Sequence, residues 1–188
     1  FRWLYVSNVD LYKHQWHVVS AVDQLRRHRI PVALDLIGPS KARGLRRLRE
    51  AIQQVDPTED FIRYHGWVPH FDLPKLYSKA DGFVFASSCE NMPNILLEAM
   101  ASGLPIASSG RGPMQEILGD AGVYFDPEDP DQIAKAMLRL LESSDLRKKK
   151  AWAAYDKSKD YSWERCARET FEFLASFIRK GQQPDEDD

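Results

Sequence analysis

Residues 83–108 read FVFASSCENMPNILLEAMASGLPIAS. The apolar run 83–86 predicts a short strand, residues 94–102 predict a helix, and residues 105–108 predict a second strand. Short strands that are apolar on both faces and alternate with helices are typical of a parallel sheet buried between helical layers. This strand–helix–strand unit therefore predicts an α/β fold.

The same alternation extends in both directions along the 188 residues. Outside this unit, strands are expected at residues 3–7, 32–37, 61–64 and 123–125. Helical periodicity predicts further helices at residues 14–28, 41–54, 72–80, 113–118, 131–143, 145–158 and 163–179. Six strands separated by helices predict a doubly wound, Rossmann-like parallel sheet with the strand order 3-2-1-4-5-6.

The composition is that of a soluble globular protein, with 43% apolar and 29% charged residues. One domain is expected over residues 1–180, followed by a polar, acidic and disordered tail at residues 181–188. The net charge of −2 argues against nucleic acid as a partner. No apolar run approaches the roughly 20 residues of a transmembrane helix. The chain opens within a predicted strand and without a methionine, so we expect further residues upstream in the natural protein.

The two cysteines, Cys89 and Cys166, form no CxxC motif and imply no disulfide framework. A reducing, cytoplasmic location is therefore expected. The chain also lacks the glycine-rich motifs of dinucleotide-binding and P-loop proteins, which argues against NAD and against a P-loop site.

Neither of two patterns that contain potential metal ligands predicts a metal site. His14 and His17 are three residues apart, but two histidines alone are too few ligands. Asp129 lies in an acidic run, and because Pro130 follows it we expect it to cap a helix rather than to hold calcium.

Two clusters of basic residues stand out from an otherwise balanced charge pattern. One lies on the predicted helix 41–54, and the other is the lysine run 148–150. We interpret both as solvated helix faces. The alternative for the first cluster is an acidic acceptor or a lipid headgroup, which would give the full-length protein a peripheral membrane contact. That cluster consists of Lys41, Arg43, Arg46, Arg47 and Arg49.

The segment after the fourth predicted strand carries polar groups at the edge of the sheet where a ligand is expected. In open parallel sheets, ligands bind beyond the carboxyl ends of the strands. Pro93 fits the first turn of the helix that follows, and Asn91 is expected to cap it. This helix is apolar almost all round except for Asn94, Glu98 and Ser102, so it is expected to be largely buried.

A carboxylate on a buried helix needs partners, because burying an unpaired charge is costly. Sugar or ribose hydroxyls would be suitable donors to Glu98, and the free N–H groups at the helix N-terminus would face a phosphate. Glu90 lies in the loop just before the helix. From spacing alone, the alternative is that Glu98 lies on an ordinary solvated stripe and that Glu90 is a loop acid.

Residues Glu90 to Glu98 form a Glu-x7-Glu motif, and the chain continues from Glu98 as Glu-Ala-Met-Ala-Ser-Gly-Leu-Pro. This combination resembles the signature of the GT4-type glycosyltransferases. Further similarities to that family occur at residues 66–69, 110–118 and 160–163, and the resemblance covers about residues 3–178. It implies the C-terminal half of a GT-B fold.

The resemblance further implies that the chain is the nucleotide-sugar-binding half of a retaining glycosyltransferase of hexosyl type. The donor would be a UDP- or GDP-linked sugar. The acceptor site of such enzymes belongs to the N-terminal domain of the same chain, so these residues alone are expected to be inactive. The family implies no metal and no cofactor other than the donor substrate, and polysaccharide biosynthesis is the expected setting.

The resemblance also assigns roles to residues at the strand ends. It implies that Glu90 contacts the donor sugar, that Glu98 contacts the ribose and that Val68 lies beside the base. The family pattern Gly-Arg-x4-Lys-Gly after the first strand places Lys13 at the diphosphate, as a catalytic residue together with Glu90. The residues implied to lie near the phosphates are Asn91, Met92, Pro93 and Asn94.

Ser7 and Asn8 stand where the family pattern has Gly-Arg, which removes one fixed positive charge from the predicted phosphate site. Asn8 remains a candidate binding residue, and phosphate neutralisation would depend on Lys13 and the helix N-terminus. This departure favours one alternative, a non-catalytic nucleotide-sugar-binding module. A related GT-B enzyme, such as a nucleotide-sugar epimerase or a phosphorylase, is the other. Tyr77, on the helix after the third strand, is interpreted as part of the core.

Overall fold

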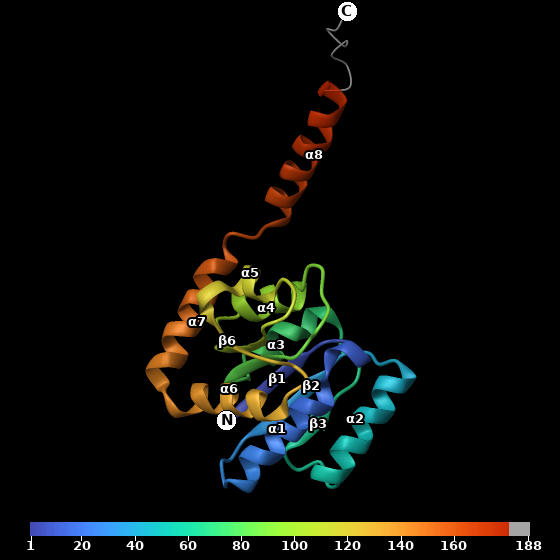
Figure 1. The fold of residues 1–188 in the computed structure, drawn as a ribbon, viewed down its shortest axis with the longest axis vertical. Coiled ribbons are helices and arrows are strands. Elements are labelled where there is room, and N and C mark those ends of the chain that lie inside the picture. The colour runs from blue at the N-terminus through green and yellow to red at the C-terminus, as the bar shows by residue number, and fades with distance from the viewer. Residues whose placement is uncertain (181–188) are drawn as a thin grey trace, which may run out of the picture. The chain divides into compact units, whose positions relative to one another are not determined.

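Figure 1 shows the computed structural model, which describes residues 1–180, with side chains as far as Phe177. The predicted tail at 181–188 lies outside the described residues. The chain divides into two compact units, residues 1–158 and the segment that begins at Lys159. The first unit carries the sheet and every candidate site residue. The domain boundary expected at residue 180 stays a prediction.

A six-stranded parallel sheet forms the centre of the first unit, with the strand order β3-β2-β1-β4-β5-β6. All neighbouring strands run parallel. The doubly wound fold and the strand order expected from the sequence are therefore confirmed. The strands are β1 (Arg2–Val6), β2 (Ala33–Ile37), β3 (Ile62–Tyr64), β4 (Gly82–Phe85), β5 (Ile106–Ser109) and β6 (Gly122–Phe125).

Helices connect successive strands, and further helices follow β6. They are α1 (Gln15–Arg27), α2 (Ala42–Val55), α3 (Leu73–Tyr77), α4 (Asn94–Ala101), α5 (Met114–Leu118), α6 (Pro130–Glu142), α7 (Ser144–Ser158) and α8 (Trp163–Lys180). Short 3-10 turns occur at Leu11–Lys13 (η1), His70–Asp72 (η2) and Gly119–Ala121 (η3). Most of these bounds lie within a residue or two of the predicted helices.

The largest difference between a predicted helix and the structure is at residues 72–80, where α3 ends at Tyr77. Leu73 and Tyr77, one turn apart, are its buried residues. The chain must then turn to enter β4, and the backbone N–H of Asp81 already donates to the carbonyl of Arg2 in β1 at 2.9 Å. The demands of strand pairing therefore shorten the helix.

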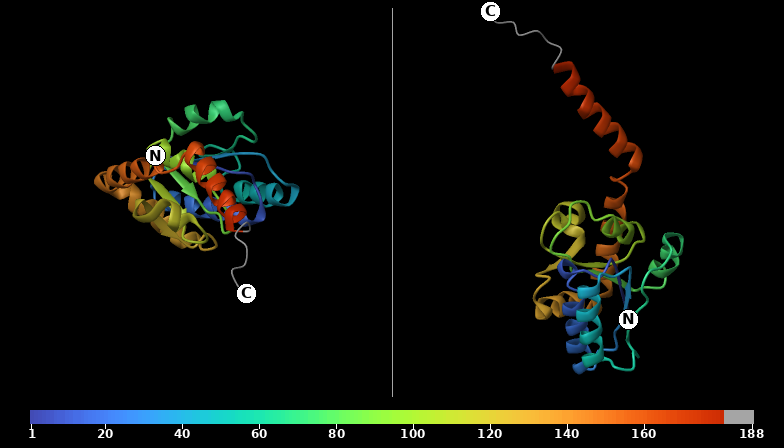
Figure 2. Two further views of the ribbon diagram at one scale, coloured as in Figure 1. Left: turned by 90° about the horizontal axis from the view of Figure 1, so that it is seen from above. Right: turned by 90° about the vertical axis from the view of Figure 1, so that its right-hand side faces the viewer.

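Helices cover both faces of the sheet (Figures 1 and 2). On one face α1 packs between α2 and α6, whereas α4 packs against α7 on the other. Right-handed crossovers require this arrangement, because the chain steps from β1 outward to β3 and then from β4 outward in the opposite direction. The loops that leave the two central strands, β1 and β4, therefore diverge to opposite faces.

The central strands are buried on both faces, which explains why they are mostly apolar. Every residue of β4 and of β5 is buried. The rings of Tyr5 and Phe85 meet edge-on with their centroids 5.9 Å apart, and those of Phe83 and Phe85 lie 6.2 Å apart. Among the described residues, no helix combines the length and the apolar character needed to cross a membrane.

Two glycines allow the chain after β2 to pack directly against the loop after β1. Gly38 has φ +139°, and a Cβ there would lie 2.1 Å from the carbonyl oxygen of Ser7. A Cβ at Gly44, in the first turn of α2, would lie 2.8 Å from the carbonyl oxygen of Val9. The N–H of Val9 also donates to the carbonyl of Pro39 at 2.7 Å. The residues that leave β1 are thus fixed from one side.

The N-terminus of α6 is capped as predicted. Oδ1 of Asp129 accepts hydrogen bonds from the backbone N–H groups of Asp131 at 2.9 Å and Gln132 at 3.2 Å. Pro130 occupies the first turn of the helix. The acidic run 126–131 therefore serves partly to begin a helix.

Within the second unit, α8 is the helix expected near residues 163–179. Arg165 Nε pairs with Glu169 Oε1 at 2.6 Å, one turn along the helix. The rings of Phe173 and Phe177 meet edge-on with centroids 4.9 Å apart. Large apolar side chains of α8 are exposed, namely Trp163, Phe171, Phe173, Leu174 and Phe177, and Trp163 is 79% exposed.

Candidate functional site

The loops that follow β1 and β4 bring together the two residues predicted to be catalytic. Lys13 ends η1, and its ammonium forms an ion pair with Oε1 of Glu90. The two side chains are only 5% and 14% exposed. Because β1 and β4 are neighbours, residues 77 positions apart in the sequence meet at one edge of the sheet.

Aromatic rings and a backbone contact fix the position of Lys13. Its Nζ lies 5.0 Å from the ring centroid of Tyr12 and 5.4 Å from that of Phe85, within the range of cation–π attraction. The hydroxyl of Tyr5 donates to the carbonyl of Lys13 at 2.5 Å. Burial raises the pKa of Tyr5 well above its ordinary value, so this hydroxyl remains a donor. The ammonium is therefore held within a partly apolar pocket, opposite one carboxylate.

Asp10 anchors the turn that presents Lys13. Its Oδ1 accepts from the N–H of Leu11 at 2.8 Å, and its Oδ2 lies 2.5 Å from Nζ of Lys41. The hydrogen bond from Lys41 holds the pKa of Asp10 below its ordinary value, although burial opposes it. The basic cluster of α2 thus contributes one lysine to the architecture of the site.

Glu98, predicted to contact a ribose, lies on α4 between two side chains from the β3–α3 segment. The hydroxyl of Tyr77 donates to Oε2 at 3.1 Å, and Nε2 of His70 lies 3.2 Å from Oε1. Burial, followed by the Glu98 carboxylate, raises the pKa of Tyr77, so its hydroxyl keeps its proton. Tyr77 is 3% exposed and packs on Phe83, so the core interpretation was correct about its ring and missed its hydroxyl.

The N-terminus of α4 differs from the predicted cap. The helix begins at Asn94, and no side chain caps it. Pro93, which was expected in the first turn, instead occupies the cap position. The expectation that Asn91 caps the helix was wrong, because Asn91 lies three residues before the first helical residue. Asn91, Met92 and Asn94 are exposed, so these side chains are accessible to a ligand beside Glu90.

Asn8 and Val68 lie in two other loops at the carboxyl ends of the strands. Asn8 is half-buried, and its carbonyl accepts from Nε2 of Gln15 at 2.9 Å. Val68 is half-buried in the segment between β3 and α3, next to Trp67, which is 69% exposed. The same segment provides His70, so the predicted base neighbour and a partner of Glu98 share one loop.

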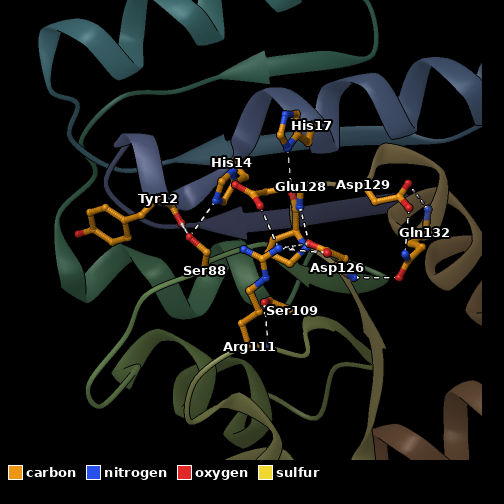
Figure 3. A network of polar contacts seen from close by, with 11 residues as sticks. Tyr12, His14, His17, Ser88, Ser109, Arg111, Asp126, Glu128, Asp129 and Gln132 are labelled. Carbon is orange, nitrogen blue, oxygen red and sulfur yellow. Dashed lines mark hydrogen bonds and ion pairs between the residues drawn. The ribbon is translucent and has the colours of Figure 1, made fainter.

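A polar network that sequence reasoning missed lies at the same edge of the sheet (Figure 3). Nη2 of Arg111, in the loop after β5, donates to both carboxylate oxygens of Asp126 at 2.8 and 3.0 Å and lies 2.9 Å from Oε2 of Glu128. Nδ1 of His17, on α1, lies 2.9 Å from the carbonyl oxygen of Pro127. The acidic run 126–131 was the signal in the sequence that could have predicted this network, because carboxylates gathered at a strand end favour a cation beside them. Within the described residues, no group of three or more His, Cys, Asp or Glu side chains could hold a metal ion.

The basic cluster of α2 is exposed, and two of its members have defined contacts. Lys41 pairs with Asp10, as described, and the guanidinium of Arg47 lies 4.2 Å from the ring centroid of Trp16. In the second cluster, the ammonium of Lys150 donates to the carbonyl of Asp120. Contact of either cluster with an acidic acceptor or a membrane stays a prediction.

A sequence model of the family described as Glycosyl transferases group 1 matches residues 1–143. The chain belongs to this family. It is 38% identical over 112 residues to the O-antigen chain mannosyltransferase B of Escherichia coli, a match that covers 60% of this chain and 29% of that protein. The resemblance carried by the Glu-x7-Glu segment is therefore confirmed, and sugar transfer is the activity of the family to which the chain belongs.

Solved structures share the fold of this glycosyl transferases group 1 chain. Sucrose-phosphate synthase from Thermosynechococcus elongatus is 26% identical with a TM-score of 0.82, and the match covers 95% of this chain and 46% of that one. Anabaena HepE, in complex with UDP and glucose, is 20% identical with a TM-score of 0.83, over 94% of this chain and 48% of that one. The GT-B-type fold is confirmed, and the chain spans less than half the length of the proteins it matches.

Glu90→Gln is expected to lower the free energy of unfolding by about 1–3 kcal/mol, because it leaves the buried Lys13 ammonium without its charged partner. The double change Lys13→Met and Glu90→Gln is expected to cost less than Glu90→Gln alone, since no unpaired charge then remains. Urea-induced unfolding at pH 7 measures both. A double variant at least as unstable as the single one would contradict the role of the ion pair.

Proposed function

We propose that the chain is the donor-binding half of a retaining glycosyltransferase, which moves a hexosyl unit from a UDP- or GDP-linked sugar to an acceptor. The observation that carries the proposal is the buried Lys13–Glu90 ion pair at the carboxyl edge of the sheet, beside the N-terminus of α4. The acceptor would bind to an N-terminal domain of the same protein, which would close over the donor.

Lys13 would stabilise the diphosphate as it leaves. In a site partly shielded from water, an ammonium interacts with developing negative charge more strongly than in bulk solvent. The donor diphosphate would compete with Glu90 for this ammonium. The carboxylate released from that contact would then accept a hydrogen bond from the donor sugar and orient it. No cofactor beyond the donor is required, because Lys13 and the N-terminus of α4 supply the positive charge.

Glu98 would hold the ribose. Tyr77 and His70 each occupy one acceptor position on its carboxylate, which offers about four, and its side chain is 29% exposed. Ribose hydroxyls would take the remaining positions. The loop with Val68 would contact the base, and the segment from Asn91 to Asn94, together with Asn8, would face the phosphates.

The related proteins support this proposal. The relative from Escherichia coli is named as an O-antigen chain mannosyltransferase, and the Anabaena structure holds UDP and glucose on the same fold. Polysaccharide biosynthesis in the cytoplasm is therefore the setting we propose for the full-length enzyme. For the basic cluster of α2, contact with an acidic acceptor or a membrane surface is the alternative to a solvated helix face.

A non-catalytic nucleotide-sugar-binding module is the second candidate, and one observation favours it. Ser7 and Asn8 replace the Gly-Arg pair of the family pattern, so the pattern leaves Lys13 as its only cation at the phosphates. A transfer assay on the full-length protein with its natural N-terminal region decides between the two functions, because a binding module would not turn over the donor.

The chain alone is expected to bind UDP or GDP weakly and to transfer no sugar, because half of a two-domain cleft provides half of the contacts. Isothermal titration calorimetry with UDP, GDP and ATP measures the binding, with ATP as the comparison nucleotide. Release of UDP or GDP from a panel of nucleotide sugars measures transfer. Robust transfer by the chain alone would contradict the half-enzyme proposal.

Glu98→Ala is expected to weaken UDP or GDP binding by about 1.5–3 kcal/mol, because a charged acceptor for the ribose is lost. The change should matter little for the 2′,3′-dideoxy analogue of the same nucleotide. Calorimetry with both nucleotides provides the measurement, and Glu50→Ala on the exposed face of α2 is the control. Equal losses for ribose and dideoxyribose nucleotides would remove Glu98 from the ribose site.

Lys13→Ala is expected to weaken UDP or GDP binding about 10- to 100-fold while barely changing the affinity for uridine or guanosine, since only the diphosphate reaches the ammonium. Lys13→Met should behave in the same way. Calorimetry and ligand-observed NMR measure the two classes of ligand, and Lys79→Ala is the exposed-lysine control. Equal effects on nucleoside and diphosphate would show that Lys13 does not contact the phosphates.

A further inference from the structure

His14, the residue after Lys13, adopts a left-handed backbone conformation with φ 49° and ψ 30°. Glycine enters this region freely, whereas residues with a Cβ are strained there. The Gly-Arg-x4-Lys-Gly pattern has glycine at this position. A histidine is therefore held here against its local backbone preference, and its side-chain contacts must offset the strain.

The His14 ring is buried and makes contacts on several sides. It is 6% exposed and stacks on the ring of His17, with centroids 5.4 Å apart and an interplanar angle of 18°. It also meets the indole of Trp16 at 5.9 Å. Nε2 lies 2.9 Å from Oγ of Ser88, in the loop after β4 (Figure 3).

Ser88 connects this ring to the backbone beside Lys13. Its N–H donates to the carbonyl of Tyr12 at 2.8 Å, and its hydroxyl donates to the same carbonyl at 3.3 Å. We assign the proton of the neutral His14 ring to Nε2, because the Ser88 hydroxyl donates to the Tyr12 carbonyl and its oxygen can then accept from Nε2–H. Three hydrogen bonds thus join Tyr12 and His14, which flank Lys13, to Ser88, which lies two positions before Glu90.

His14 is an uncharged side chain in this site. With the proton on Nε2, Nδ1 is a buried acceptor that has no hydrogen-bond partner among the described residues. Burial, and then the neighbouring His17, hold the pKa of His14 below its ordinary value. The imidazole is therefore neutral near pH 7 and does not replace the missing arginine as a cation. Its contribution must be geometric.

We propose that His14 is a positioning residue, which acts through Ser88 to lock the loop after β1 to the loop after β4 and so holds Lys13 opposite Glu90. The inference rests on the proposed function, because it concerns how Lys13 meets the donor diphosphate. It extends the site to a side chain that touches neither the donor nor the reacting atoms.

Ser88→Ala tests the proposal, because it removes the hydroxyl and keeps the backbone bond to Tyr12. We expect the affinity for UDP or GDP, whichever the wild-type chain binds more tightly, to fall about three- to tenfold, because both hydrogen bonds of the hydroxyl, to His14 and to the Tyr12 carbonyl, are lost. The affinity for the matching nucleoside should not change. His14→Gly, which also relieves the backbone strain, should show the same selective loss. The variant that carries both changes should lose no more affinity than Ser88→Ala alone.

A second arm uses the Lys13→Ala chain as background. If His14 and Ser88 act through Lys13, Ser88→Ala should cause no further loss of UDP or GDP affinity there. Ser20→Ala is the matched control, because it removes a hydroxyl that donates to the carbonyl of Trp16 at 3.0 Å on the same helix. It should leave both affinities unchanged. Thermal unfolding of each variant separates loss of fold from loss of binding.

The outcomes distinguish the inference from the function on which it rests. A wild-type chain that binds neither UDP nor GDP overturns both. The positioning role alone is overturned if the wild-type chain binds UDP or GDP and Ser88→Ala leaves that affinity unchanged. It is also overturned if Ser88→Ala weakens nucleoside and diphosphate binding equally.

Discussion

The parallel pairing of β1 with β4 is the constraint on which the candidate site depends. Trp3 pairs with Gly82 and Leu4 with Phe83, and a Cβ at Gly82 would lie 2.8 Å from the indole of Trp3, so this close approach requires glycine. From these two neighbours the chain departs toward opposite faces of the sheet, because right-handed crossovers lead outward in opposite directions. In sheets of this kind the ligand binds between such diverging loops. Lys13 and Glu90 meet there.

Paired charge is the second principle of the site. Lys13 has Glu90, and Arg111 has Asp126 and Glu128, so each cation already faces an anion. Without its partner, the Lys13 ammonium, whose side chain is 5% exposed, would lose much of its hydration without compensation. A donor diphosphate must therefore compete with a carboxylate for Lys13. In the proposed reaction the negative charge on the leaving diphosphate grows as the bond to the sugar breaks. The diphosphate therefore competes with Glu90 for Lys13 most effectively in the transition state, which is stabilised more than the bound substrate.

The family resemblance pointed to Lys13 and Glu90, and local pattern pointed to the loops that carry them, but neither predicted the contacts between side chains. Asn91 failed as a cap because Pro93 delays the helix to Asn94, and spacing alone did not reveal which residue is the first helical one. Tyr77 was assigned to the core from its place on an apolar helix face. Its hydroxyl nevertheless reaches Glu98, which is 21 positions away. His14 was considered only as one of a pair of histidines, although the glycine that the family pattern has at this position was a signal of its left-handed backbone.

The sequence by itself determined the class of fold and pointed to the segments that carry the candidate site, and it favoured the strand order that the structure has. Apolar periodicity reports burial, and alternating strands and helices with right-handed crossovers leave few topologies open. Only the tertiary structure decided which side chains face one another. Lys13 with Glu90, His14 with Ser88 and Glu98 with Tyr77 are pairs that join different loops and helices. Their contacts depend on packing distances of a few ångströms, which no pattern within one segment encodes.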